Sequence, residues 1–440
     1  MTSATLWTRR RGATLALVVT AMAFATLSRA CDAQDTTQAP SGVRIGLTYQ
    51  PGVKPGVLVL PVSGTAGDSL RKIVQRDLDN GDRVTVVSEE VAAPGTSLNY
   101  PLFTQLGVNV VLRPMLTGDG VRVEVHDATA GRVAETRTYA LPQPAQSAAW
   151  RMAVHGIADD LEQMMFGTRG VAQSRIAFVK NGRVYVVDSD GANAMPLTSA
   201  GPLSVSPSWH PSGRYLAYSV MGTKSQIIVR DLTNGQERAL VATPGGLNIT
   251  PVWSPDGTTI SYAHGEDAGT DIISANAFDN SPGRQLTVGR GSENVSPSFS
   301  PDGRRMAFVS GRAGHPDVYL ADVDGTNVEL LTPDALGDQS YRSDPDWSPD
   351  GRAVAYQSQI SGDFQLMVIS LRDRSVKQLT SEGSNEDPSW APDSRHLIFT
   401  STRTGVKELW VMDAESGRVR QLTRLGGAKL AAWSRPLGAR

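Results

Sequence analysis

The most regular feature of the chain is an alternation of polar turns and short apolar runs along its C-terminal part. The turn reads Pro-x-aromatic-x-Pro-x-Gly, precedes an apolar run each time and recurs every 43 to 48 residues. The copies are Pro207–Gly213, Pro251–Gly257, Pro297–Gly303, Pro345–Gly351 and Pro388–Ser394, of which the last lacks the closing Gly. A fixed period of this length indicates a repeat architecture.

Each repeat contains material for four strands. Pro and Asp in the Ser-Pro-Asp-Gly turn favour a tight turn, and Gly accepts the positive φ that re-enters the next strand. Leu216–Tyr218 and Ile227–Val229 are examples of the second and third strands, and a final strand ends in Leu-Thr, as at Leu286–Thr287. Four strands in about 40 to 50 residues predict one blade of a β-propeller.

The two ends of the array complement each other. Ile176–Phe178, Val184–Val186 and Leu197–Thr198 form a blade without its first strand, whereas Ala432–Ser434 is a first strand with no blade after it. We therefore expect a six-bladed, all-β propeller over residues 174–434 that is closed by the C-terminal strand. Closure removes the unpaired sheet edges that an open array would expose.

Residues 43–168 lack the repeat and predict an α/β domain ahead of the propeller. Period-3.6 apolar positions indicate helices around Leu70–Leu78 and Ser147–Phe166. The predicted strands are Val57–Leu60, Val84–Val87, Val108–Leu112, Val121–Val125 and Val133–Tyr139. The fold class is therefore multidomain, an N-terminal α/β domain followed by the propeller.

The N-terminus has the layout of a secretory signal. Arg9–Arg11 precede the uncharged stretch Gly12–Ser28, so we expect a cleaved signal peptide over 1–33, a flexible tail over 34–42 and a periplasmic location. A retained membrane anchor and a lipid on Cys31 are the alternatives. Loss of the four Arg in residues 1–30 takes the net charge from −2 to −6, which argues against nucleic acid as a partner.

The residues offer little for catalysis or metal binding. Cys31 is the only cysteine, which excludes an intramolecular disulfide, and the six His show no ligand spacing. His155 is interpreted as a packing or hydrogen-bonding residue. Asp188–Gly191 and Asp322–Gly325 are interpreted as hairpin turns, because a calcium loop needs ligands through a twelfth position. We expect no catalytic residue, no metal and no cofactor.

Three features together resemble the TolB family of the periplasmic Tol–Pal system. They are Val43–Ile45 followed by the Gly56–Val62 strand, the helix from Trp150 to Phe166 that leads into Arg175–Val179, and the Trp-Ser-Pro-Asp-Gly blades. The order of signal, small α/β domain, six blades and stop is more specific than the blade motif alone. The resemblance implies a non-catalytic, monomeric scaffold that supports cell-envelope integrity and outer-membrane invagination during division.

The resemblance also implies two binding sites and no direct contact with the membrane. Val43, Arg44 and Ile45 would engage a TolA-like inner-membrane protein. Residues just before the motif Pro, at one mouth of the propeller, would hold a Pal-like peptidoglycan-associated lipoprotein. These are Asn248, Ile249, Thr250, Asn294, Val295, Ser296, Arg342, Asp344, Asn385 and Asp387. Arg342 departs from the Asn of the other copies, and such polar residues can also serve only the turn backbone.

The alternative function is a propeller enzyme or ligand sensor, lactonase- or peptidase-like, that uses the central channel. A peptidase of the prolyl-oligopeptidase kind needs Gly-x-Ser-x-Gly, which the sequence lacks. Asp344, Asn385 and Asp387 are the channel residues that such a site would use.

Overall fold

A computed structural model describes residues 54–88, 97–222, 225–240, 246–279, 281–289, 292–332 and 341–437. All of the described residues belong to one compact unit. The predicted signal peptide, tail and Val43–Ile45 segment lie outside the described residues. No helix in the described ranges combines the length and the apolar character that a membrane crossing requires.

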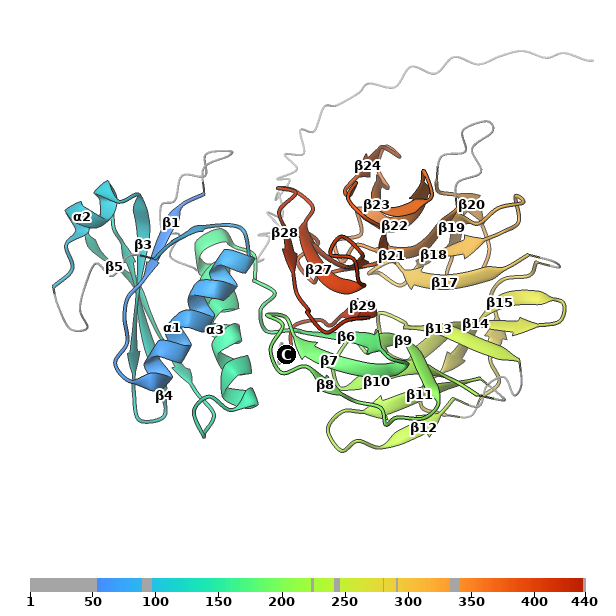
Figure 1. Ribbon diagram of the computed structural model, residues 1–440, viewed down its shortest axis with the longest axis horizontal. Helices are drawn as coiled ribbons and strands as arrows, with labels where there is room; N and C mark the ends of the chain where they lie inside the picture. The colour runs from blue at the N-terminus through green and yellow to red at the C-terminus, as the bar shows by residue number, and fades with distance from the viewer. Residues whose placement is uncertain are drawn as a thin grey trace, which may run out of the picture. The chain divides into compact units, whose positions relative to one another are not determined.

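The α/β part is a five-stranded sheet in the order β2-β1-β3-β4-β5, in which β1 runs parallel to both of its neighbours. Its strands are β1 Gly56–Val59, β2 Thr85–Val87, β3 Val108–Leu116, β4 Gly120–Asp127 and β5 Arg132–Ala140. Its helices are α1 Thr65–Asn80, α2 Tyr100–Gln105 and α3 Ala148–Phe166. Leu70 and Val74 of α1 pack with Val154 and Leu161 of α3 against one face of the sheet (Figure 1).

The propeller consists of six four-stranded antiparallel sheets. Figure 1 labels most of their strands. Blade 1 is β9 Leu203–Trp209, β10 Tyr215–Met221, β11 Gln226–Asp231 and β12 Glu237–Ala239; blade 2 is β13 Leu247–Trp253, β14 Thr259–Glu266, β15 Gly269–Asn276 and β16 Arg284–Gln285; blade 3 is β17 Asn294–Phe299, β18 Arg305–Ser310, β19 Asp317–Asp322 and β20 Glu329–Leu330. Blade 4 is β21 Arg342–Trp347, β22 Ala353–Ile360, β23 Asp363–Ser370 and β24 Val376–Gln378; blade 5 is β25 Asn385–Trp390, β26 His396–Ser401, β27 Glu408–Asp413 and β28 Val419–Gln421.

Blade 6 is composite and closes the ring. The C-terminal strand β29 Lys429–Trp433 pairs with β6 Arg175–Lys180, which continues to β7 Arg183–Asp188 and β8 Met195–Pro196. Ala432 lies opposite Ala177, and Trp433 lies opposite Ile176. The α/β domain, the six blades and the closing strand confirm the fold class that the sequence predicted. The domain limits at 168 and 174 stay a prediction.

Candidate functional site

Every innermost strand carries a β-bulge at the residue that precedes the motif Pro or its equivalent. These residues have left-handed backbone with φ between 50° and 55°, and the bulge shifts the register against the second strand. They are Ser206, Thr250, Ser296, Asp344, Asp387 and Leu430. A non-Gly residue in this conformation costs on the order of 1 kcal/mol, so its sixfold recurrence is a built feature of the ring.

The bulge brings residues of adjacent innermost strands together around the propeller axis. The Ser296 amide donates to Thr250 Oγ1 at 3.3 Å, and Ser296 Oγ donates to Asp344 Oδ1 at 3.2 Å. The Leu430 amide donates to Asp387 Oδ2 at 3.0 Å. Thr250, Ser296, Asp344 and Asp387, which the sequence singled out, are therefore half-buried residues next to the axis.

The polar residues three positions before the Pro have a different environment. Asn248, Asn294, Arg342 and Asn385 are at most 5% exposed. Asn385 Nδ2 donates to Gln365 Oε1 at 3.0 Å and also to the Glu382 and Gly383 carbonyls. These four side chains tie each innermost strand to the preceding blade, and the structure gives them no surface for a partner.

The ties follow one plan that includes the Leu-Thr ending of each blade. In blade 4, Thr380 Oγ1 accepts the Leu366 amide and donates to Gln365 Oε1, which accepts from Asn385 in blade 5. In blade 3, Thr332 Oγ1 donates to Asp317 Oδ1, which accepts from Arg342 Nη1 at 2.7 Å. The Thr hydroxyl therefore connects the outer edge of one blade to the inner strand of the next.

These hydrogen bonds explain why position 342 can be Arg where the other blades have Asn. Where the residue is Asn, a cation from the next hairpin can reach its amide oxygen: Arg312 Nη2 donates to Asn294 Oδ1, and Arg403 Nη2 donates to Asn385 Oδ1. Both guanidiniums also stack on blade aromatics, Arg312 over Tyr319 and Arg403 over Trp410. Arg342 supplies the guanidinium from the inner strand itself and pairs with Asp317.

The antiparallel order places the loops on two faces. The connections between blades and the hairpins between second and third strands share one face, which we call the mouth face. The turns between first and second strands and between third and fourth strands form the other face, which we call the turn face. All of the candidate residues 248–250, 294–296, 342, 344, 385 and 387 lie on innermost strands, between the mouth face and the bulge.

The mouth face has a feature that the sequence reasoning missed. Eleven large hydrophobic residues are exposed among the described propeller residues. Seven lie on the mouth face, namely Leu203, Leu247, Val288, Tyr341, Ile360, Val406 and Leu425. Phe278 lies on the turn face, and Met195, Val328 and Val376 lie on or next to outermost strands. Leu203, Leu247 and Tyr341 share a position four residues before the Pro, a signal that the repeat alignment contained.

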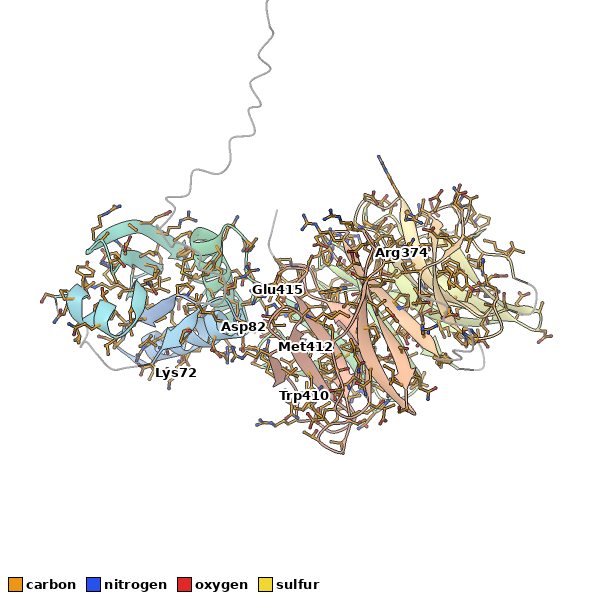
Figure 2. All side chains as sticks on the ribbon, turned by 90° about the horizontal axis from the view of Figure 1, so that it is seen from above. Lys72, Asp82, Arg374, Trp410, Met412 and Glu415 are labelled. Atoms are coloured by element: carbon orange, nitrogen blue, oxygen red, sulfur yellow. The ribbon has the colours of Figure 1, made fainter. Side chains whose placement is uncertain are left out.

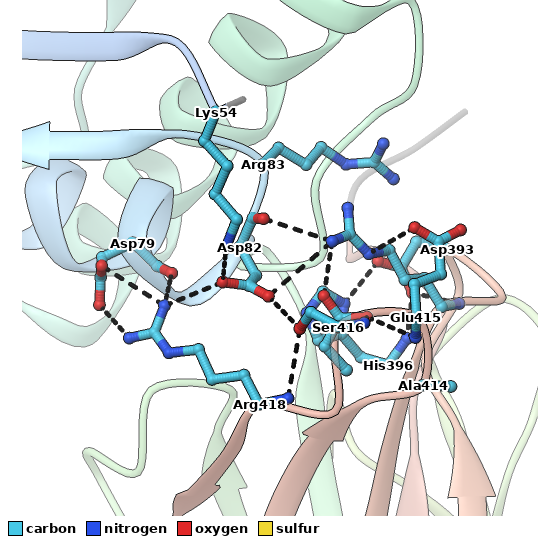
Figure 3. Close-up of polar contacts among 12 residues, drawn as sticks. Lys54, Asp79, Asp82, Arg83, Asp393, His396, Ala414, Glu415, Ser416 and Arg418 are labelled. Atoms are coloured by element: carbon cyan, nitrogen blue, oxygen red, sulfur yellow. Dashed lines mark hydrogen bonds and ion pairs between the residues drawn. The ribbon is translucent and has the colours of Figure 1, made fainter. Parts of the chain in front are cut away.

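On the turn face, polar side chains bond within their own turns and to the α/β domain. In blade 3, Ser300 Oγ donates to Asp302 Oδ1 at 2.6 Å inside the turn, and Asp302 accepts the Arg304 amide. Arg418 of blade 5 donates to Asp79 Oδ2 at 2.6 Å and to Asp82 Oδ1 at 3.2 Å (Figure 3).

Asp82 is at the centre of these contacts between the α/β domain and blade 5, which we call the seam. Asp82 Oδ2 accepts from Ser416 of blade 5, and Lys54 also pairs with Asp82. Figure 2 shows Asp82 beside Glu415, both of which approach Arg395. A small cavity lined by Asp82, His396, Arg418 and Arg420 is part of the same seam.

Three carboxylates of the innermost strands have higher pKa values than ordinary surface carboxylates. Burial raises the pKa of Asp344, and burial together with the charge of Asp344 raises the pKa of Asp387 to about 6. Burial also raises the pKa of Asp346 to about 6, although its carboxylate accepts the Trp390 amide at 2.6 Å. Burial thus favours the protonated forms of these carboxylates, and a nearby positive charge would stabilise their ionised forms.

In the described ranges, one group has ligand atoms close enough for a metal ion, His155 with Asp188 and Asp190. His155 Nδ1 lies 2.6 Å from Asp77 Oδ2, an arrangement that metal-binding histidines often have. However, Arg76 and Arg151 pair with Asp190, and Arg175 pairs with Asp188. The arginines already neutralise these carboxylates, so the donor set does not suit a divalent cation, and His155 acts as a buried hydrogen-bonding residue.

The chain is similar in sequence to a known family of propeller proteins. Residues 162–437 match the family model of the TolB beta propeller domain. The Tol-Pal system protein TolB of Histophilus somni (strain 2336) is 30% identical over 234 residues, which cover 48% of this chain and 53% of that protein. Its counterpart in Legionella pneumophila subsp. pneumophila is 28% identical over 196 residues, which cover 41% and 46%. The chain thus spans about half the length of the curated relatives it matches.

A solved structure supports the fold beyond the matched propeller. TolB from Acinetobacter baumannii superimposes with a TM-score of 0.75 and 22% identity, over 88% of this chain and 98% of that one. The putative TolB from Agrobacterium tumefaciens has a TM-score of 0.50 and 20% identity over 58% of this chain and 91% of that one. The first superposition is consistent with an α/β region followed by a six-bladed propeller.

Proposed function

Because the chain belongs to the TolB beta propeller domain family, we propose that it is a periplasmic component of a Tol–Pal system that binds other proteins and catalyses no reaction. Its mouth face would hold a Pal-like peptidoglycan-associated lipoprotein. Its N-terminal segment, Val43–Ile45, would engage a TolA-like inner-membrane protein. The two contacts would link the layers of the envelope and support its invagination during division.

The observation that carries the mouth-face assignment is the distribution of exposed hydrophobic residues. Scattered single apolar residues on a surface need no explanation, but a gathering on one face favours a protein-binding site. Seven of the eleven in the described propeller lie on the mouth face, where Val288 is 80% exposed. The α/β domain contacts turn-face residues of the propeller such as Arg395 and Arg418.

Four of the candidate side chains tie adjacent blades together, and their burial limits which residues can contact a partner directly. Asn248, Asn294, Arg342 and Asn385 would act indirectly, by holding the innermost strands in place. Direct contacts would come from the seven exposed hydrophobic residues of the mouth face, which we call the rim. They would also come from the half-buried residues Ile249, Thr250, Val295, Ser296, Asp344 and Asp387. This division is itself testable, because a rim substitution and a tie substitution should change different measured quantities.

The decisive experiment measures binding of the soluble domain of a Pal-type lipoprotein encoded in the same genome. The variant Leu247→Ser/Val288→Ser/Tyr341→Ser removes three rim residues that no core cluster includes. We expect its affinity to fall by about tenfold or more, since buried apolar and aromatic contacts dominate such interfaces. Phe278→Ser on the turn face is the matched control, and equal affinities for all three proteins would reject the mouth-face assignment.

The N-terminal assignment needs its own measurement. Deletion of residues 34–47 should abolish binding to a TolA-type domain and leave Pal-type binding unchanged, because the two proposed sites use separate segments. Loss of both activities on deletion would contradict this separation.

The absence of catalysis is tested by titration with calcium and zinc in a calorimeter. We expect no stoichiometric binding, because the group around His155 is already neutralised by arginines. Tight binding of one metal ion per chain would favour the alternative of a propeller enzyme or ligand sensor.

A further inference from the structure

The residues nearest the axis on the mouth side differ between two arcs of the ring. In blades 1 and 2, alternate positions are apolar, with Leu203 and Leu247 exposed at the rim and Val205 and Ile249 half-buried behind them. We call these four residues the apolar arc. The innermost strands of the blades contact one another in sequence around the ring, so the arc is continuous from β9 to β13.

Blades 4 and 5 present carboxylates on the corresponding stretch of their innermost strands. Asp344 and Asp387 occupy the two bulges, and Glu386 precedes Asp387. We call Asp344, Glu386 and Asp387 the acidic arc. The bulge position carries Ser206 and Thr250 in blades 1 and 2 but Asp344 and Asp387 in blades 4 and 5. The position before it is apolar in blades 1 and 2, at Val205 and Ile249, and acidic in blade 5, at Glu386, which backbone geometry alone does not require.

Two positive groups near the acidic arc pair with carboxylates other than Asp344 and Asp387. Lys407 pairs with Glu386 at 2.6 Å, and Arg342 pairs with Asp317. Lys429 is exposed on the adjacent closing strand. In the described part of the chain, no ion pair includes Asp344 or Asp387, whose hydrogen-bond donors are hydroxyl groups and the Leu430 main-chain amide. Their mutual repulsion is therefore left without a direct counter-charge, and a cation placed between them would relieve it.

We infer that the mouth face takes an extended partner segment with an apolar side chain on the apolar arc and a Lys or Arg side chain between Asp344 and Asp387. The inference rests on the proposed function, because it names the chemistry of the partner that the mouth face binds. The apolar arc supplies buried area, and the acidic arc orients the segment through charge complementarity.

Selection from a displayed library of random short peptides on the full chain is the direct test. We expect the enriched peptides to combine a basic residue with neighbouring apolar residues. For one enriched peptide, Asp344→Asn/Asp387→Asn should weaken binding about tenfold or more, as expected when a close interfacial charge pair is lost. The double variant and the wild-type chain should bind the Lys→Gln or Arg→Gln form of that peptide with equal affinity.

The control is Asp302→Asn/Asp350→Asn, which removes two carboxylates from adjacent blades on the turn face and leaves the net charge matched. The wild-type chain gives a second readout that needs no variant. Its affinity for the basic peptide should rise as pH increases from 5 to 7, since the pKa of Asp387 is raised to about 6 and its carboxylate must lose its proton to face the cation, and should fall as salt is added.

Each outcome bears on a different statement. Enriched peptides without a basic residue, or equal affinities in the Asn double variant, overturn this inference. If rim substitutions still abolish Pal-type binding in that case, the proposed function stands alone. Calcium that competes with the peptide only when Asp344 and Asp387 are intact would show that the acidic arc takes a metal ion, and would also overturn the inference.

Discussion

The two faces of the propeller are built from the same strands, yet they differ in what their loops leave exposed. On the turn face the loops between first and second strands repeat nearly the same sequence, and their polar side chains bond within the turn, as Ser300 and Asp302 show. On the mouth face the loops differ from blade to blade and expose apolar side chains such as Val288 and Leu247. Repetition therefore specifies the ring, whereas departures from repetition mark the surface that is free to bind.

The faces also differ in their relation to the α/β domain. Arg395, Arg418 and Asp190 of the turn face take part in ion pairs with that domain. Burying these charges costs free energy unless they are paired, so this seam is sensitive to the removal of single partners. The mouth face has no such internal partner among the described contacts, and substitutions there should change binding more than stability.

The largest stability effect is expected at the seam, where burial raises the pKa of Glu162 to about 8. Between its ordinary value of 4.5 and about 8 the folded chain keeps a proton that the unfolded chain releases, so stability falls as pH rises through this window. Glu162→Gln stays neutral and should be more stable than the wild type at pH 8 by on the order of 3 kcal/mol.

Urea unfolding followed by tryptophan fluorescence at pH 4.5 and pH 8 measures this difference. At pH 4.5 the two proteins should unfold alike, because Glu162 is protonated in the folded chain. Glu415→Gln, whose side chain is 75% exposed, is the control and should show no such pH dependence. A parallel pH profile for Glu162→Gln and the wild type would contradict the raised pKa.

The next effect concerns the inter-blade ties. Asn385→Ala removes the partner of the buried Gln365 and leaves the half-buried Arg403 guanidinium without its amide acceptor. An unsatisfied buried polar group of this kind should lower the free energy of unfolding by about 2 to 3 kcal/mol. The measurement is again urea unfolding, with Asp363→Ala on an exposed hairpin as the control. A decrease in the free energy of unfolding below that of the control would show that Asn385 does not hold the two blades together.

The fold could be predicted from the sequence because its determinants are local and repeated. Pro, Asp and Gly specify each turn, and the half-blades at residues 176 and 433 have one way to satisfy their edges, which the pairing of Trp433 with Ile176 realises. The helix α2 was missed because it is only six residues long and depends on the Asn99 cap, which a periodicity argument does not detect.

The roles of the site residues could not be predicted in the same way. The sequence places Asn385 and Asp387 two residues apart, which suggests a shared face in a regular strand. The bulge at Asp387 breaks that alternation, so Asn385 turns into the blade interface and Asp387 lies by the axis. The exposure of Val288 depends on where the blade connection leaves the sheet, which the apolar pattern does not encode.

A smaller effect tests whether the seam and the mouth face are independent. Asp82→Asn keeps the shape of the side chain and weakens its pairs with Lys54 and Arg418. We expect unfolding to become easier by about 1 to 2 kcal/mol, because the carboxylate is 2% exposed and its partners remain. Affinity for the Pal-type domain should not change, and a parallel loss of affinity would show that the two faces are coupled.

The smallest stability effect compares two exposed hydrophobic residues, one from each face. Phe278 is 47% exposed, but its ring lies 5.3 Å from Tyr215 and 5.9 Å from Trp253 between centroids, so Phe278→Ser should cost about 1 kcal/mol. Val288, at 80% exposed, has little contact area to lose, and Val288→Ser should stay within about 0.5 kcal/mol of the wild type. Thermal unfolding of both variants decides the matter. If Val288→Ser proved as costly as Phe278→Ser, the exposed residues of the mouth face would have a structural role, and their gathering there would lose its value as a sign of binding.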